Sequence, residues 1–203
     1  MIQKSSGWAL IIGALALTGY AIAFPIILPP LGGNVDFVSW VTHPLWRWLC
    51  LTAMIGLIVM MFGFIGLYIR IKSQSGLTGM AGFVALEVAL LMMICILSWE
   101  VFQYPVIGEH TEAAFLLRDR IIWGDPAVSF FRVAASAMAL LAMMLFGSGV
   151  LRSGQFGKLA PSLIGLGVVG TLLSFVSVLI ELAGIVLLGL GVALLGVRLA
   201  RGR

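Results

Sequence analysis

The chain has 203 residues, of which 62% are apolar and only 10% are charged. Water-soluble domains are about 25% charged, and a soluble fold of this length could not bury so much apolar surface. The composition therefore excludes a water-soluble fold and predicts a single transmembrane domain. The net charge of +4 comes from basic residues scattered at the ends of apolar segments, so it does not indicate a nucleic-acid partner.

Six apolar runs are each close to the ~20 residues that a helix needs to cross a bilayer. The last two runs are nearly continuous, and Glu181 is their only charge. Because about 39 residues is too long for one crossing, we expect a tight turn around Ile180 and Glu181. The pattern predicts an all-α six-transmembrane-helix bundle with spans over residues 7–28, 46–69, 77–101, 127–151, 160–179 and 182–199.

The predicted loops differ in charge. If the N-terminus lies inside, eight of the twelve basic residues fall in cytoplasmic segments, and no acidic residue does. This positive-inside bias predicts an even number of crossings with both termini cytoplasmic. We interpret the membrane as a bacterial cytoplasmic (inner) membrane.

The two predicted outer loops, residues 29–45 and 102–126, are longer and less basic than the inner ones. Between Glu109 and Trp123, charged residues alternate with apolar ones, which predicts a short amphipathic helix on the outer interface. We therefore expect specific chemistry on the outer side or in the outer half of the bilayer.

Glu87 lies near the middle of the third apolar run, about ten residues from its start and so ~15 Å deep. An ionisable group at that depth is costly and indicates a function. One hypothesis is a proton- or cation-binding carboxyl in a transport path. The other is a neutral acid that hydrogen-bonds to a backbone carbonyl or to a hydroxyl, for which the candidates are Thr18, Thr52, Ser136 and Thr171.

A second candidate site combines five outer residues: His43, Arg47, Glu100, His110 and Arg132. Glu100 lies one turn from the outer end of the third span and Arg132 one turn into the fourth, so a Glu100–Arg132 or Glu100–Arg47 pair is predicted. The group either anchors the loops as a salt-bridge network or binds an anionic headgroup or small ligand. In the second case Arg47 and Arg132 would bind the anion.

The two histidines, His43 and His110, raise a third possibility. Together with Glu100 they could ligate a divalent metal, and as a pair they could ligate a haem. The sequence has no H-x-x-H, H-E-x-x-H or E-x-x-H pattern, and the predicted spans have no histidine. The sequence therefore requires no cofactor.

Cys50 and Cys95 both lie in apolar runs. We expect each to be a small buried hydrophobic residue. Because they are predicted at similar depth on adjacent helices, a disulfide between them is geometrically conceivable.

Three functions follow from these patterns. The first is a non-catalytic accessory or scaffold subunit that binds lipid at the outer leaflet and packs against other membrane subunits or a second copy. Small-residue patterns such as Gly19-x-x-x-Ala23 favour such close helix contacts. The second is a small proton- or cation-coupled transporter that uses Glu87. The third is a haem- or metal-binding redox subunit that uses His43 and His110.

Overall fold

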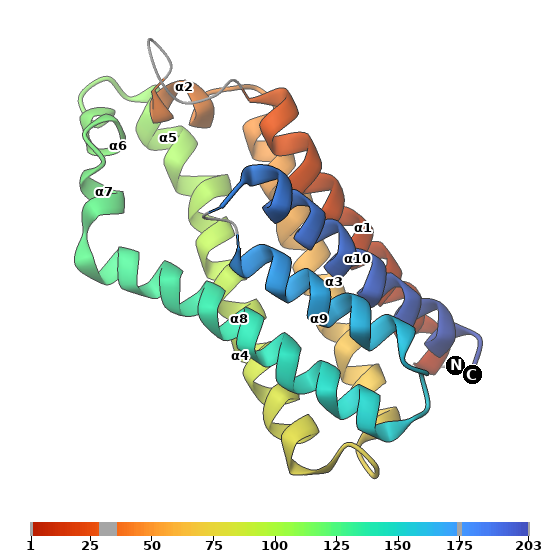
Figure 1. Cartoon of the computed structure of the whole chain (residues 1–203). Helices are drawn as coiled ribbons and strands as arrows, with labels where there is room; N and C mark the ends of the chain where they lie inside the picture. The colour runs from red at the N-terminus through yellow and green to blue at the C-terminus, as the bar shows by residue number, and fades with distance from the viewer. Residues whose placement is uncertain (1, 29–35, 174–175, 203) are drawn as a thin grey trace.

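The structure is a computed structural model that describes residues 2–28, 36–173 and 176–202, and all secondary structure in these ranges is helical (Figure 1). In chain order the helices are α1 Ile2–Ile27, α2 Phe37–Val41, α3 Trp46–Ile71, α4 Gly76–Ser98, η1 Trp99–Gln103, α5 Tyr104–Glu109, α6 Phe115–Arg118, α7 Ile121–Gly124, α8 Pro126–Ser153, α9 Leu159–Leu172 and α10 Val178–Ala200.

Five of the described helical stretches are long and apolar enough to cross a membrane: α1, α3, the continuous stretch from α4 to α5, α8 and α10. Their outward side chains are apolar, as lipid contact requires: Ile26, Leu77 and Phe130 are each at least 75% exposed. Helix α9 has 14 residues, or about 21 Å, which is short of the ~30 Å hydrocarbon layer. The chain is therefore a helical protein suited to a membrane, with five of the six expected spans at full length.

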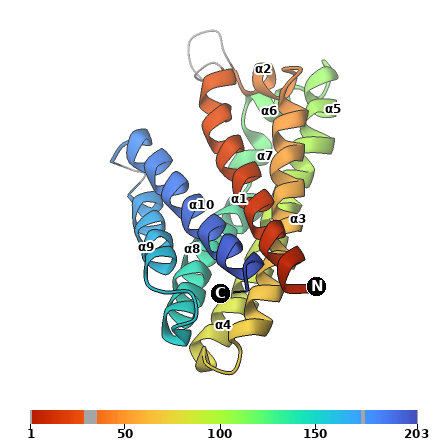
Figure 2. The same ribbon diagram turned by 90° about the vertical axis from the view of Figure 1, so that its right-hand side faces the viewer.

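The helices pack as a chain of neighbours. Helix α1 packs on α3 and on α10, α10 packs on α9, and α4 packs on α8. Figure 2 shows that α9 and α10 diverge from α1 and α3 away from the end where α1 begins and α10 ends. We call that end the termini end. The opposite end, where α2, α5, α6 and α7 lie (Figure 1), is the cap end.

Glycines bring helix pairs into backbone contact. A Cβ on Gly82 of α4 would meet the backbone N of Phe146 on α8, and a Cβ on Gly149 of α8 would lie 2.6 Å from the Cα of Gly79. Apolar side chains gain little from leaving lipid for a protein interior, so helices in membranes associate by such close packing. These glycines fix α4 against α8 over the half nearest the termini end.

The turn between the last two helices lies earlier than expected. Helix α9 ends at Leu172, and α10 begins at Val178, so Ile180 and Glu181 belong to the first turn of α10. The side chain of Ser177 accepts a hydrogen bond from the N–H of Leu179 at 3.2 Å and caps the helix. Glu181 then lies at the positive end of the helix dipole, where a carboxylate is stabilised.

The predicted amphipathic helix over residues 109–123 is also wrong as a continuous element. It divides into α6 and α7, because Arg120 between them adopts a left-handed conformation with φ 55°. The described parts of the two outer loops nevertheless pack together as a cap. Arg118 forms an ion pair with Asp36 at 3.3 Å, and α2 contacts α5 and α6.

Candidate functional site

Glu100 lies where the third span departs from α-helical geometry. In the π-helix η1, the N–H of Tyr104 donates to the carbonyl of Trp99, five residues back. Pro105 follows, and its lack of an N–H prevents the regular α-helical hydrogen bond at that position. Such π-segments often occur at functional sites. Glu100 is 7% exposed, and in the described ranges it is the only charged side chain that is buried.

Glu100 accepts two hydrogen bonds from α3, one at its backbone carbonyl and one at its carboxylate. The indole Nε1 of Trp46 on α3 donates to the Glu100 backbone carbonyl at 2.8 Å, and the Cys50 Sγ lies 3.6 Å from Glu100 Oε2 as a hydrogen-bond donor. Tyr20 of α1 lies close to Cys50 in turn. The sequence did not predict Tyr20 or Trp46 as neighbours of Glu100, because helix register across three spans is not encoded in local pattern.

Arg132 approaches the same region from α8. Its guanidinium lies over the ring of Trp123, 3.4 Å from the centroid, and the side chain lies close to that of Tyr104. Two buried donors nearby lack an acceptor among the described residues: Arg132 Nη1 and Trp123 Nε1. An unpaired buried donor costs about 1–3 kcal/mol. The cluster therefore contains one charged donor, on Arg132, and one neutral donor, on Trp123, that no described residue accepts from.

The predicted ion pairs of Glu100 are not formed. Arg47 instead pairs with Glu109, with 3.1 Å between Nη2 and Oε1, and both side chains are at least half exposed. That prediction is wrong because Glu100 points into the bundle, whereas Arg47 lies on its surface. Over the described ranges, no nitrogen of Arg132 lies within 4.0 Å of a Glu100 oxygen, although the two charges still interact.

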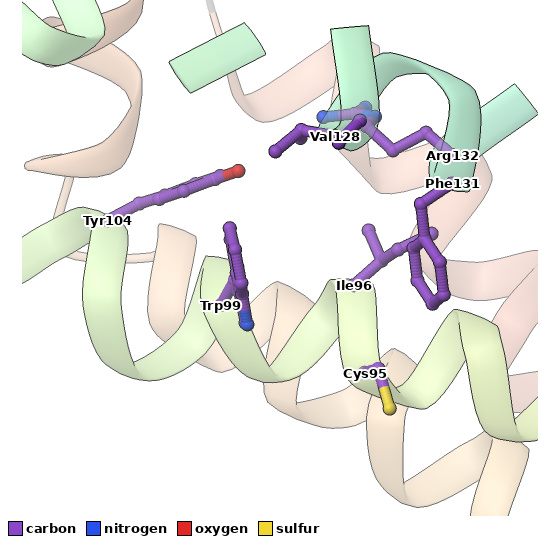
Figure 3. Close-up of a pocket in the computed structure, with 8 residues that line it drawn as sticks. Cys95, Ile96, Trp99, Tyr104, Val128, Phe131 and Arg132 are labelled. Atoms are coloured by element: carbon purple, nitrogen blue, oxygen red, sulfur yellow. The ribbon is translucent and has the colours of Figure 1, made fainter. Parts of the chain in front are cut away.

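A cavity of about 300 Å³ separates the end of α4 and η1 from the start of α8 (Figure 3). In Figure 3 the hydroxyl of Tyr104 points toward Val128 and the Arg132 guanidinium, while Cys95 lies at the other end. Trp99 and Phe131 are 40% and 38% exposed, so the cavity opens on the apolar surface that faces lipid. The lining residues are Cys95, Ile96, Trp99, Tyr104, Ala127, Val128, Phe131 and Arg132.

The two histidines do not complete a metal centre with Glu100. Across the part of the chain that the structure describes, no group of three His, Cys, Asp or Glu side chains converges as a possible metal site. His110 is exposed on the cap, and His43 Nδ1 accepts a hydrogen bond from the N–H of Leu45 at 3.2 Å. The geometry gives the metal and haem hypothesis no support.

Glu87 is half-buried on α4, and its buried Oε1 has no hydrogen-bond partner among the described residues. Two of the predicted hydroxyl partners are used within their own helices: Thr52 donates to the Trp48 carbonyl and Thr171 to the Gly167 carbonyl. The predicted hydrogen bond is therefore not made by Oε1.

The cysteines differ from each other. Both are free thiols, so the conceivable disulfide is not formed. Cys50 is buried, as predicted, but Cys95 is exposed on the cavity wall.

The cavity was not predicted from the sequence, because its walls combine Trp99 with Phe131 of another span. The available signal was Pro105, whose position five residues after Glu100 indicates an irregular helix.

Comparison with known proteins does not identify this site. No protein-family model, no curated protein and no solved structure matches the chain. Function is therefore argued from the chemistry of the site.

Proposed function

We propose that this protein is a non-catalytic membrane protein that binds an amphiphile with an anionic head in the cavity between η1 and α8. One observation supports the proposal most strongly. Arg132 lines a cavity that opens toward lipid, and its buried Nη1 has no acceptor among the described residues. A bound acceptor would offset the cost of that unpaired donor.

The chemistry of the walls selects the class of ligand. The polar groups are donors, namely the guanidinium of Arg132 and the hydroxyl of Tyr104, and the positive charge favours a phosphate or a carboxylate. Ile96, Trp99 and Phe131 offer apolar contact to the start of an acyl chain. The cavity is large enough for a headgroup, and the chain would continue along the exposed rings into the bilayer.

Native mass spectrometry of the detergent-purified protein tests the proposal. We expect the wild type to retain phosphatidylglycerol more strongly than phosphatidylcholine, and Arg132→Gln to lose that preference by about tenfold, or ~1.4 kcal/mol. Oleate in a competition arm distinguishes a carboxylate head from a phosphate head. Arg47→Gln is the matched control, because Arg47 lies at the same end but is exposed and already paired. Equal retention of both lipids by the wild type would refute the proposal.

We further infer an accessory role in a membrane complex or a homo-oligomer, because no sequence motif indicates a reaction. Membrane lipid is then one partner and a second membrane chain the other. Purification in mild detergent followed by mass spectrometry tests this inference. A stoichiometric companion or a dimer mass supports it, and a monomer alone contradicts it.

A proton- or cation-coupled transporter that uses Glu87 is the second candidate function. The specific observation in its favour is the buried Oε1 without a partner in the described part of the chain. None of the three cavities described is lined by Glu87, which is why we rank it second. Proton flux into proteoliposomes is the test: flux by the wild type that Glu87→Gln abolishes would favour transport, and equal flux would eliminate it.

We also propose that α9 completes six crossings of a bacterial inner membrane, with the termini end cytoplasmic. Two observations favour this arrangement. Helix α1 begins and α10 ends at the same end, and basic residues outnumber acidic ones there. A C-terminal tag should resist external protease in intact cells and become cleavable only after lysis. Cleavage in intact cells would contradict this orientation.

A further inference from the structure

We propose that Glu100 is a proton-binding residue coupled to the cavity, so that the anionic head and a proton bind together. This inference rests on the proposed binding of an anionic amphiphile by Arg132. Ligand binding at that site would then depend on pH, and the proton would be a second species that the site takes up.

The position of Glu100 is the first step. Trp99 precedes it in η1 and Tyr104 follows the π-helix, and both residues line the cavity. Glu100 itself is more than nine-tenths buried, is not among the residues that line the cavity, and contacts Cys50 of α3. Glu100 therefore lies in the helical segment that forms one wall of the cavity, although its own side chain does not line the cavity.

The second step is the set of groups that face Glu100. They are Tyr20 from α1, Cys50 from α3, Tyr104 from α5 and Arg132 from α8. Helix α4, which leads into η1, contributes Cys95 on the cavity side. Arg132 is the only positively charged member of this set, and it lies too far from Glu100 for an ion pair among the described residues. Arg132 is thus the one cation in this set that interacts with the buried carboxyl of Glu100, and Arg132 is also the proposed ligand-binding residue.

The third step is the balance of charge. If Glu100 is ionised, it neutralises Arg132 from a distance, and an incoming anion leaves the cluster with a net negative charge in a region of low dielectric constant. If Glu100 is protonated, the anion and Arg132 neutralise each other. The anion therefore binds preferentially to the protonated form. By linkage, ligand binding takes up a proton, and affinity falls as the pH rises.

Lipid affinity as a function of pH tests this coupling. The probe is brominated phosphatidylglycerol in detergent, which quenches nearby tryptophans and whose phosphodiester stays ionised throughout. Because Trp8 and Trp48 are exposed as well as Trp99, the binding signal is the part of the quenching that Arg132→Gln removes. His43 and His110 are both replaced by glutamine in every sample, so that no histidine contributes to the pH dependence. We expect affinity at least about tenfold higher near pH 5.5 than near pH 8.5. Glu100→Gln should bind equally at both.

The outcomes separate the two proposals. Binding that is independent of pH, or a pH dependence that persists in Glu100→Gln, overturns the coupling and leaves lipid binding intact. Failure of the parent protein to bind at either pH refutes the proposed function itself. If Glu100→Gln does not fold, a pH-indicator dye measures proton uptake when phosphatidylglycerol is added to the parent protein. Uptake supports the coupling, and its absence overturns it.

Discussion

Arg70 and Arg132 are two arginines near opposite ends of the bundle, and both lie over an aromatic ring. Arg70 is 5.8 Å from the centroid of Phe156, and Arg132 is 3.4 Å from that of Trp123. At the termini end, Arg70 donates from Nε to Gln155, from Nη1 to Gln3 and from Nη2 to the Gly202 carbonyl, at 3.0–3.1 Å. At the cap end, Arg132 Nη1 has no acceptor among the described residues.

The helices around the two arginines differ in the same way. Near the termini end, Gly79 and Gly149 bring α4 and α8 into backbone contact. Near the cap end, Trp99 and Phe131 line the cavity that separates these helices. A closed end whose arginine donates hydrogen bonds from all three of its nitrogens stabilises the fold, whereas an open end whose arginine has an unused donor is suited to bind a ligand.

The largest effect is expected for Gly82→Leu. A side chain there would clash with the backbone of Phe146, which cannot move aside as a flexible side chain could. We expect a loss of about 2–3 kcal/mol in the free energy of unfolding, measured by denaturation in detergent. Gly19→Leu is the control, because no described atom lies within 4 Å of the Cβ that it would add. Equal loss in both variants would contradict close packing of α4 and α8.

Arg70→Met should have the next largest effect. It removes three hydrogen bonds that join α3 to both ends of the chain and to Gln155. At about 1 kcal/mol per hydrogen bond, discounted for partial exposure, the expected loss is ~1–2 kcal/mol. The same unfolding measurement applies. No change would show that the termini end is not held by this network.

Arg132→Met should leave the ligand-free protein as stable as the wild type, or stabilise it by up to about 1 kcal/mol. The substitution loses the contact of Arg132 with Trp123 and its attraction to Glu100, but it also removes a buried charge with a donor that lacks an acceptor in the described structure, and methionine fills similar space, so these effects largely offset one another. Unfolding in detergent without added lipid measures this. A loss as large as that of Arg70→Met would indicate a structural role and would remove the contrast between the two arginines.

The smallest effect concerns Asp36 at the cap. The backbone N–H of Ser39, then its hydroxyl, with Arg118 adding to them, hold the pKa of Asp36 below its ordinary value of 3.8. A lowered pKa in the folded state stabilises the protein above the unfolded value, and this contribution is lost as the pH falls through the folded pKa. Because the side chain is exposed, we expect only a few tenths of a kcal/mol.

Unfolding of the wild type and Asp36→Asn measures this contribution. The variant should be slightly less stable near neutral pH, and the two proteins should converge below about pH 3. A constant difference at all pH values would show that the carboxylate charge does not matter at the cap.

The sequence predicted the long helices well because hydropathy depends on composition over many residues. The second span was expected over residues 46–69 and is observed as Trp46–Ile71. The turn before α10 was misplaced because Glu181 was interpreted as a loop residue, although Ser177 provides the cap. The charge of Glu181 correctly indicated that the helix is interrupted nearby, but the hydrogen bond of the Ser177 cap sets where α10 begins.

The candidate site was predicted only in part. Glu100 and Arg132 were both proposed, and the structure brings them to one cluster, but Arg47 lies elsewhere. The contributions of Cys50 and Tyr20 depend on how three helices are rotated against one another. That rotation is set by packing at glycines and aromatic rings distant in sequence, so local periodicity could not predict it.

A structure determined with phosphatidylglycerol present tests the central claim most directly. The account predicts a headgroup phosphate in the cavity between η1 and α8, with an oxygen about 2.7–2.9 Å from a guanidinium nitrogen of Arg132. A cavity that holds only acyl chain, with Arg132 turned to pair with Glu100, would contradict it.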